Sequence, residues 1–368
     1  MIERFIDPDK IDADSGCIQM DHIFSGEKVR DGKILHGFEL AETGRVEKEG
    51  VEVAGICEDR MGIHAIVEGI SDDSAQAIES LFSEIISRMR GVEYRFRKEN
   101  VLIAVSDESL DSFTPECVGK ILFKAIKSIR AVRKVRIRII CDRDEFEEAK
   151  RRAEEVHAER ERRSRDLKDE DVQEFYICES CKVYLPYHAC IITPERPSPC
   201  GTLYGEAKSA VELEVVGYYS SAEKGEVIDR EKGEYRKINE EIERRTESRV
   251  KRIRIHSILE HPPLTGNFAQ AIVFYIPEKD GFGIVDRSFK GKTPLGLRFD
   301  EMEKFILGTQ AEGFAGISFA YMKSGGFLRG EGGWKRVVWV SPGIYEFIRT
   351  FLPEKILKNI STEGRRSS

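Results

Sequence analysis

One short segment constrains this chain more than any other, because it holds four of the eight cysteines. The segment reads ICESCKVYLPYHACIITPERPSPCG at residues 177–201, and its spacing is C-x2-C-x8-C-x9-C, formed by Cys178, Cys181, Cys190 and Cys200. Four thiolates can hold a tetrahedral zinc ion or the corners of a [4Fe–4S] cube. Zinc ribbons usually present two C-x2-C pairs, and only the first pair here has that spacing. The four prolines between the cysteines keep the loop extended around a bulky body, so the spacing favours iron–sulfur over zinc.

The overall composition excludes several classes of protein. A length of 368 residues is enough for two domains with separate cores. With 40% hydrophobic residues, 34% charged residues and a net charge of −7, we expect a globular protein with no nucleic-acid partner. The N-terminal MIERFIDPDKID lacks an apolar signal region, and no stretch approaches the roughly 20 apolar residues of a membrane span. We therefore expect a cytoplasmic protein without a membrane partner.

The remaining cysteines are scattered along the chain. In a reducing compartment, clustered thiols bind metal more often than they pair as disulfides, and a chain of this length needs no disulfide for stability. Cys141 ends an alternating apolar run and Cys117 lies in a helical pattern, so both are interpreted as small buried hydrophobes. No function is assigned to these two, to Cys17 or to Cys57.

Residues 1–145 have the pattern of an α+β domain. Apolar side chains recur at helical spacing within residues 72–91, and Gly91 is placed to end that helix. A second helical pattern covers residues 117–129. Short alternating runs predict strands at residues 51–56, 63–69, 101–105 and 135–140.

Residues 146–171 are predicted to be a charged helical connector, in a helix that begins near Asp144. Its apolar stripe is limited to Phe146, Ala149, Ala153 and Val156, and its charges alternate in sign, as in a solvated helix. Beyond it, residues 172–360 form a second domain, and residues 361–368 a disordered tail. Strand-like runs in this domain lie at residues 250–259, 271–278, 282–287, 313–322 and 335–340, before a helical pattern at 344–360. The predicted fold class is α/β, with the α+β domain first and an α/β domain after it.

The cysteine segment resembles the A-cluster loop of the acetyl-CoA synthase β subunit of the archaeal acetyl-CoA decarbonylase/synthase complex. The four cluster cysteines of that loop have the same spacing, and the loop includes CIITP and RP. The likeness continues in LKDEDVQEFY before the loop and in AIVFYIPEKDGFGIVDRSFKGKTPLGL, EGFAGISFAYMKS, FLRGEGGWKRVVWV and LPEKI after it. The resemblance implies an A-cluster-type second domain and one [4Fe–4S] cluster on Cys178, Cys181, Cys190 and Cys200.

The same resemblance reveals a departure at the nickel site. In the family, a cysteine matching Cys181 bridges the cube to a nickel ion, and a downstream Cys-Gly-Cys binds two nickel ions. This chain has Gly266, Asn267 and Phe268 at those three positions, and no cysteine follows Cys200. Because nickel in such a site needs soft thiolate donors, we expect nickel to be absent.

We therefore interpret the chain as a β-subunit-like protein with one [4Fe–4S] cluster and a role in electron transfer, assembly or regulation in the one-carbon and acetyl-CoA metabolism of an anaerobic archaeon. The alternatives are a catalytic CO-methylating acetyl-CoA synthase with an altered metal site, and a zinc-stabilised scaffold. Whether the protein is an enzyme stays open. The resemblance implies as partners the subunits of a CO dehydrogenase/acetyl-CoA synthase complex, a corrinoid protein or a redox protein.

Two histidines also bear on the site. His188 lies between the second and third cysteines, where it could bind metal or donate to a cluster sulfide, although a packing or hydrogen-bonding role is the simpler expectation. His256 could contribute to a nitrogen and oxygen site with His261 and Asn267, but we expect it at the surface or at a helix cap.

Overall fold

The computed structural model describes residues 3–6, 16–21, 28–97, 100–183, 187–198, 200–215, 217–261, 269–306 and 311–362. The chain divides into two compact units, which are described separately. Unit 1 comprises Met1–Arg162 and Lys208–Val216, and unit 2 comprises Arg163–Ala207 and Gly217–Ser368. The mixture of helices and sheets confirms the predicted α/β class. The segment 208–216, which the sequence analysis placed in the second domain, belongs to unit 1.

Unit 1 is built on a seven-stranded mixed sheet, in which β2 runs parallel to β4 and β3 parallel to β7. The strand order is β1-β3-β7-β4-β2-β6-β5. The strands are β1 (Glu3–Ile6), β2 (Gly32–Thr43), β3 (Gly50–Ala54), β4 (Arg60–Glu68), β5 (Val92–Arg97), β6 (Asn100–Ser106) and β7 (Lys134–Ile140). The predicted strands at 51–56, 63–69, 101–105 and 135–140 correspond to β3, β4, β6 and β7.

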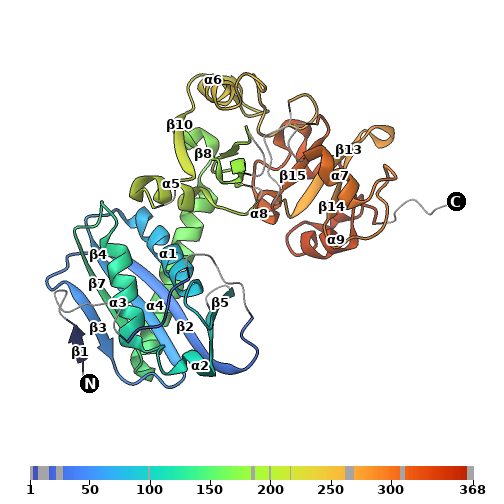
Figure 1. The fold of residues 1–368 in the computed structure, drawn as a ribbon. Helices are drawn as coiled ribbons and strands as arrows, with labels where there is room; N and C mark the ends of the chain where they lie inside the picture. The colour runs from blue at the N-terminus through green and yellow to red at the C-terminus, as the bar shows by residue number, and fades with distance from the viewer. Residues whose placement is uncertain are drawn as a thin grey trace. The chain divides into compact units, whose positions relative to one another are not determined.

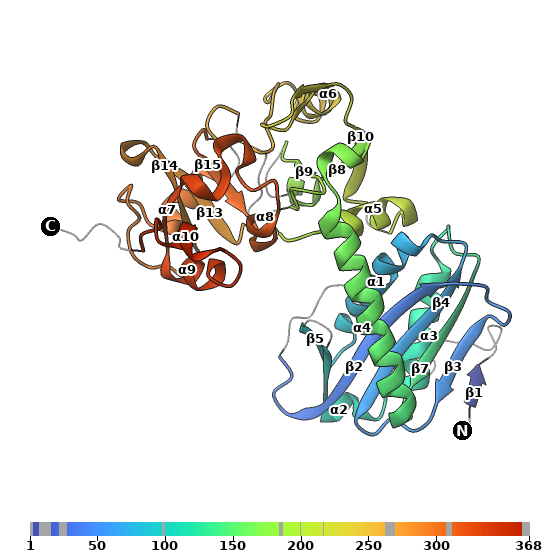
Figure 2. The same ribbon diagram turned by 180° about the vertical axis from the view of Figure 1, so that it is seen from behind.

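Helices cover both faces of this sheet. Figure 1 shows α1 (Ala75–Ser87) and α3 (Pro115–Lys127) on one face, and Figure 2 shows α4 (Arg143–Asp166) across the other. The short helix α2 (Asp107–Leu110) follows β6. The side chain of Thr114 caps α3 by accepting a 3.1 Å hydrogen bond from the backbone N–H of Cys117. Both helices predicted in this part of the chain are confirmed, and the charged helix forms as α4.

The main core of unit 1 lies between the sheet and the α1–α3 layer. Its largest fully buried side chains include Phe82, Met61 and Ile78. A smaller cluster under α4 joins Phe38 and Leu40 of β2 to Phe146. Because each face of the sheet has an apolar layer, residues 37–41 of β2 are buried on both sides of the sheet rather than in alternation, and Glu39 is the one charged residue among them.

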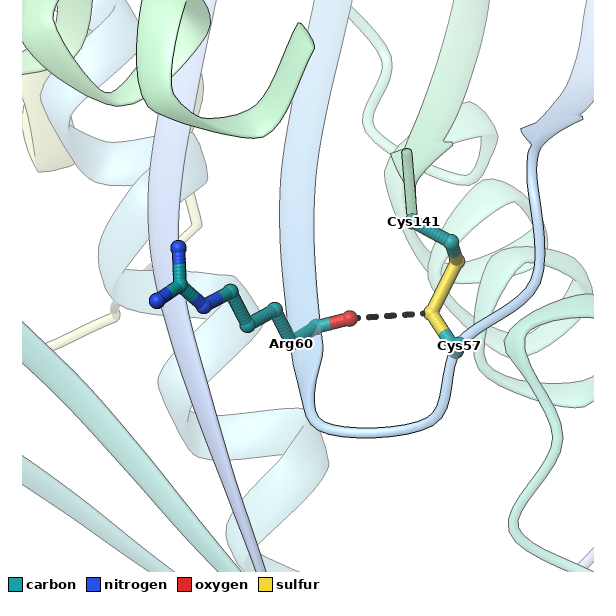
Figure 3. Close-up of a disulfide and its surroundings, with 3 residues drawn as sticks. All are labelled: Cys57, Arg60 and Cys141. Carbon is teal, nitrogen blue, oxygen red and sulfur yellow. Dashed lines mark hydrogen bonds between the residues drawn. A yellow bond between two sulfur atoms is a disulfide. The ribbon is translucent and has the colours of Figure 1, made fainter. Parts of the chain in front are cut away.

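Cys57 and Cys141 form a disulfide with their Cα atoms 4.6 Å apart, which corrects the interpretation of both as unpaired residues (Figure 3). Cys57 follows β3 and Cys141 follows β7, and these parallel neighbours end side by side, with Ala54 opposite Ile140. The carbonyl oxygen of Arg60 lies 3.1 Å from Sγ of Cys57, but a disulfide sulfur carries no hydrogen to donate, so this is a contact only. The two cysteines can pair because the sheet places β3 and β7 side by side in the same direction.

The described strands of unit 2 form three small sheets. The first is three-stranded, with order β10-β8-β9, the second pairs β11 with β12, and the third has the order β15-β13-β14-β16. The first two use β8 (Glu174–Cys178), β9 (Cys190–Ile192), β10 (Tyr219–Glu223), β11 (Val227–Asp229) and β12 (Glu234–Tyr235). The third uses β13 (Ala271–Ile276), β14 (Gly281–Asp286), β15 (Phe314–Ile317) and β16 (Val337–Val340). The helices after α4 are α5 (Tyr204–Leu213), α6 (Arg236–Arg245), α7 (Phe299–Ile306), α8 (Phe319–Lys323), α9 (Pro342–Ile348) and α10 (Glu354–Leu357).

Three predicted elements of this domain differ from the structure. Residues 250–259 form no strand, although Ile253 and Ile255 are buried in a small core beside β8. The run 313–322 divides into β15 and α8 at Ser318, whose side chain caps the helix through the N–H of Tyr321. The helical pattern 344–360 divides into α9 and α10 before Pro353, because proline removes a backbone donor.

In the part of the chain that the structure describes, no helix has the length and apolar character needed to cross a membrane.

Candidate metal centre

The three-stranded sheet of unit 2 brings two cysteines together. Cys178 ends β8 and Cys190 begins β9, and the two residues are directly opposite each other in the antiparallel ladder. Cys181 lies in the 3₁₀ turn Ser180–Val183 that follows β8. Cys200 lies within a turn that the N–H of Gly201 closes on the carbonyl oxygen of Ser198 at 2.9 Å. All four residues are reduced cysteines, and only Cys200 is exposed.

The four sulfur atoms lie close enough to influence one another. Burial raises the pKa of the Cys190 thiol well above its usual value of 9.0, the nearby charge of Arg196 opposes that rise, and the other three thiolates add to it. Burial also raises the pKa of Cys178, and Cys200 contributes to this rise. Without a bound cation, two buried thiols of the group thus hold their protons at neutral pH. A metal centre would release those protons and compensate the thiolate charge.

Polar groups of the loop surround the sulfur atoms. The hydroxyl of Ser180 lies 3.2 Å from Sγ of Cys178, and the hydroxyl of Ser198 lies 3.0 Å from Sγ of Cys200. A second hydroxyl, that of Thr202, lies 3.4 Å from Sγ of Cys200. These hydroxyls can donate hydrogen bonds to thiolates, which stabilises the charged form of sulfur.

His188 supplies a nitrogen donor beside the third cysteine. Its Nε2 atom lies 3.1 Å from Sγ of Cys190, and the side chain is buried. Burial lowers the pKa of His188 to about 4, with a further contribution from the charge of Arg196. The imidazole is therefore neutral at pH 7, and with its proton on Nε2 it donates to the Cys190 sulfur.

A tight turn connects the third cysteine to the fourth. Thr193 and Arg196 exchange backbone hydrogen bonds of 3.0 and 3.1 Å, and the Thr193 hydroxyl accepts a further bond from the N–H of Arg196 at 3.0 Å. The turn reverses the chain directly after β9. Cys200 therefore returns toward the sheet that carries Cys178 and Cys190.

A buried polar network fixes the tip of this turn. The backbone N–H of Glu195 donates to Asp169 at 3.1 Å, and the N–H of Asp169 donates to the carboxylate of Glu195 at 3.1 Å. The Nε2 atom of His256 lies 2.9 Å from the second oxygen of Asp169. Arg329 donates to both carboxylate oxygens of Glu195 at 3.0 and 2.8 Å. We call Asp169, Glu195, His256 and Arg329 the polar anchor.

The polar anchor also contains a set of possible metal-ligand atoms. One atom from each of Asp169, Glu195 and His256 lies within 4.8 Å of the others, and all three side chains are buried. Burial raises the pKa of Asp169, but hydrogen bonding and charge from His256 outweigh it, so the pKa is lowered and the carboxylate stays charged. The oxygens of Glu195 already accept from the Arg329 cation, which a metal ion would have to displace. The charge balance therefore favours a structural role for this network.

His256 is completely buried, which corrects the expectation of a surface or capping role. The close packing depends on Gly326, where an added Cβ would lie 2.6 Å from the Glu195 carbonyl oxygen and 2.7 Å from the His256 ring. The sequence analysis did not find Asp169, Arg196 or Arg329. The adjacent charged residues Glu195 and Arg196 interrupt an otherwise uncharged run, and this pattern could have indicated buried charges. The sequence around Asp169 and Arg329 gave no comparable indication.

Gly266, Asn267 and Phe268 lie outside the described residues. The expectation that they replace nickel ligands therefore stays a prediction.

Comparison with known proteins defines the class. A family model for the C-terminal part of the ACS/CODH beta subunit matches residues 157–364. The chain is 34% identical over 364 residues to the acetyl-CoA decarbonylase/synthase complex subunit beta of Methanopyrus kandleri, covering 92% of this chain and 78% of that protein. It is 34% identical to subunit beta 1 of Methanocaldococcus jannaschii, covering 92% of this chain and 48% of that longer protein. Subunit beta 2 of the same organism is 33% identical, with coverage of 92% and 77%.

The chain therefore belongs to the family of acetyl-CoA decarbonylase/synthase beta subunits, as the resemblance in the cysteine segment implied.

Proposed function

We propose that this protein binds one [4Fe–4S] cluster through Cys178, Cys181, Cys190 and Cys200, and that it serves its complex in electron transfer, assembly or regulation. The observation that carries the proposal is the convergence of four reduced thiols in one loop, with hydrogen-bond donors beside the sulfur atoms of Cys178, Cys190 and Cys200. Hydrogen bonds to the sulfurs and limited solvent exposure are features that protein sites use to tune such clusters.

The spacing of the four cysteines along the chain favours a cube over zinc. Structural zinc ribbons usually present two C-x2-C pairs, and only Cys178 and Cys181 have that spacing here. A cube takes one thiolate on each of its iron atoms, which four cysteines of unequal spacing can supply.

The nickel chemistry of the family's catalytic site is not part of this proposal. Residues 201–368 contain no cysteine, so that segment offers no thiolate to hold nickel. When bound, the cluster would supply one-electron transfer. The chain's own residues would hold it, donate hydrogen bonds to its sulfur ligands, and keep the ligands Cys178 and Cys190 away from water. Because its relatives are named as subunits of the acetyl-CoA decarbonylase/synthase complex, we propose another subunit of such a complex as the partner.

Two cysteine variants test the assignment of the ligands. Cys190→Ser should lose most of the iron and sulfide after anaerobic purification, because a buried hydroxyl is a poor replacement for a cluster thiolate. Cys117→Ser is the matched control, since Cys117 is also buried but lies in unit 1. Equal iron loss in the two variants, or full iron retention in Cys190→Ser, would refute the ligand assignment.

A further inference from the structure

Arg196 is a charged residue that the folding of the cysteine loop places inside the protein. Its relative exposure is 2%, and it closes the turn that follows β9. The Nη1 atom donates to the carbonyl oxygen of Ile191 at 2.8 Å. The side chain therefore folds back along β9 toward Cys190, the neighbour of Ile191.

An aromatic contact and the backbone hydrogen bond hold the guanidinium group of Arg196 in this position. Its central carbon lies 5.8 Å from the centroid of the Tyr321 ring, a cation–π distance. The carboxylate of the adjacent residue, Glu195, pairs with Arg329. The turn thus directs Glu195 into the polar anchor and Arg196 toward the cysteines.

The charge of Arg196 acts on the groups around the third cysteine. Burial lowers the pKa of Arg196, while Tyr321, Cys190 and Asp169 offset part of this effect, and an arginine keeps its proton in proteins. Its hydrogen bond to the carbonyl of Ile191 holds the guanidinium group one residue along the chain from Cys190, whose sulfur lies 3.1 Å from Nε2 of His188. A permanent cation is therefore built in next to the thiol cluster.

We propose that Arg196 is a charge-compensating residue of the [4Fe–4S] site, which raises the reduction potential of the cluster and stabilises its thiolate ligands without binding iron. The inference rests on the proposed function. A cube held by four thiolates is negatively charged, and one-electron reduction adds one more negative charge. A fixed cation in a low-dielectric interior favours the more negative state, so it makes reduction easier.

Three substitutions at Arg196 separate its charge from its shape. Arg196→Met and Arg196→Gln remove the charge, and Arg196→Lys keeps it without the planar group. Lys182→Met is the matched control, because Lys182 is adjacent to Cys181 in sequence but its side chain is 45% exposed and pairs with Glu179 at 3.0 Å. Water screens that charge, so its removal should leave the cluster potential unchanged.

The experiment uses the full chain, purified anaerobically, with iron and acid-labile sulfide measured first. The potential is then followed by electron paramagnetic resonance during a mediated redox titration. We expect the Met and Gln variants to be reduced at more negative potentials than the unmodified protein, and the Lys variant to stay close to it. Loaded Met and Gln variants with unchanged potential would overturn the inference.

Loss of the cluster is also informative. If both neutral variants fail to hold iron while Arg196→Lys holds it, the charge is required, as proposed. If all three variants fail alike, Arg196 acts through its shape and the inference is wrong. Absence of iron and sulfide in the unmodified protein would refute the proposed function itself. This result is therefore distinct from a failure of the inference about Arg196 alone.

Discussion

The Cys57–Cys141 disulfide should contribute substantially to the stability of unit 1, and Cys57→Ser tests this. The bridge joins residues 84 positions apart, so it closes a long loop in the unfolded chain. The chain-entropy relation gives about 4.5 kcal/mol for a loop of this size, and measured values are often lower. For a unit of this length, 1 kcal/mol corresponds to about 2–4 °C, so the melting temperature should fall by about 9–18 °C.

The assay is thermal unfolding followed by circular dichroism, with and without a thiol reductant. Cys57 is the better site to change, because it is less buried than Cys141 and its loss removes less packing. Reductant should lower the melting temperature of the unmodified protein toward that of Cys57→Ser, and should affect the variant little. Cys17→Ser is the control, because Cys17 is also partly exposed and forms no disulfide. A melting temperature that does not respond to reductant would refute the reasoning, as would alkylation of both thiols in the unreduced, denatured protein.

Three further predictions concern the packing of the polar anchor, the buried carboxyl group of Glu39, and nickel binding. Gly326→Ala should lower the free energy of unfolding by about 1–3 kcal/mol and reduce iron retention, because the added Cβ would press on the Glu195 carbonyl and the buried His256 ring. Gly217→Ala is the control and should change neither quantity, because an added Cβ there meets no atom within 4 Å. Burial raises the pKa of Glu39 well above 4.5, so the folded state holds this proton more tightly than the unfolded state and stability falls as the pH rises through this range. Glu39→Gln should therefore stabilise the protein increasingly above pH 4.5 in chemical unfolding, and a gain that is independent of pH would contradict this. Cluster-loaded protein should bind no stoichiometric nickel in a titration and should show no exchange between labelled CO and acetyl-CoA. Tight nickel binding together with exchange activity would contradict this prediction and would show that the protein is catalytic.

Local patterns predicted the elements whose burial is one-sided. Helix α1 has a simple apolar stripe, and β7 alternates between buried and partly exposed residues. Strand β2 did not give this signal, because the α1 layer and α4 bury its residues from both faces and Glu39 interrupts the apolar run. The segment 250–259 gave a false signal, since Ile253 and Ile255 alternate with arginines but pack on a small core without pairing to a strand.

The contacts that complete the candidate site are long-range, and for that reason the sequence did not reveal them. The spacing of the four cysteines was visible because all four lie in one short segment. Asp169 and His256 are separated by 87 residues and meet only after folding, as do Glu195 and Arg329, which are 134 residues apart. The disulfide was missed for the same reason, because it depends on β3 and β7 being parallel neighbours.

The most direct test of the central claim is metal analysis of the unmodified chain purified without oxygen. Iron, acid-labile sulfide, zinc and nickel are measured on the same sample and related to the protein concentration. We predict about four iron and four sulfide per chain, as expected for one cube held by four cysteines, with no stoichiometric zinc or nickel. One zinc per chain without sulfide would contradict the account and identify the cysteine loop as a structural zinc site.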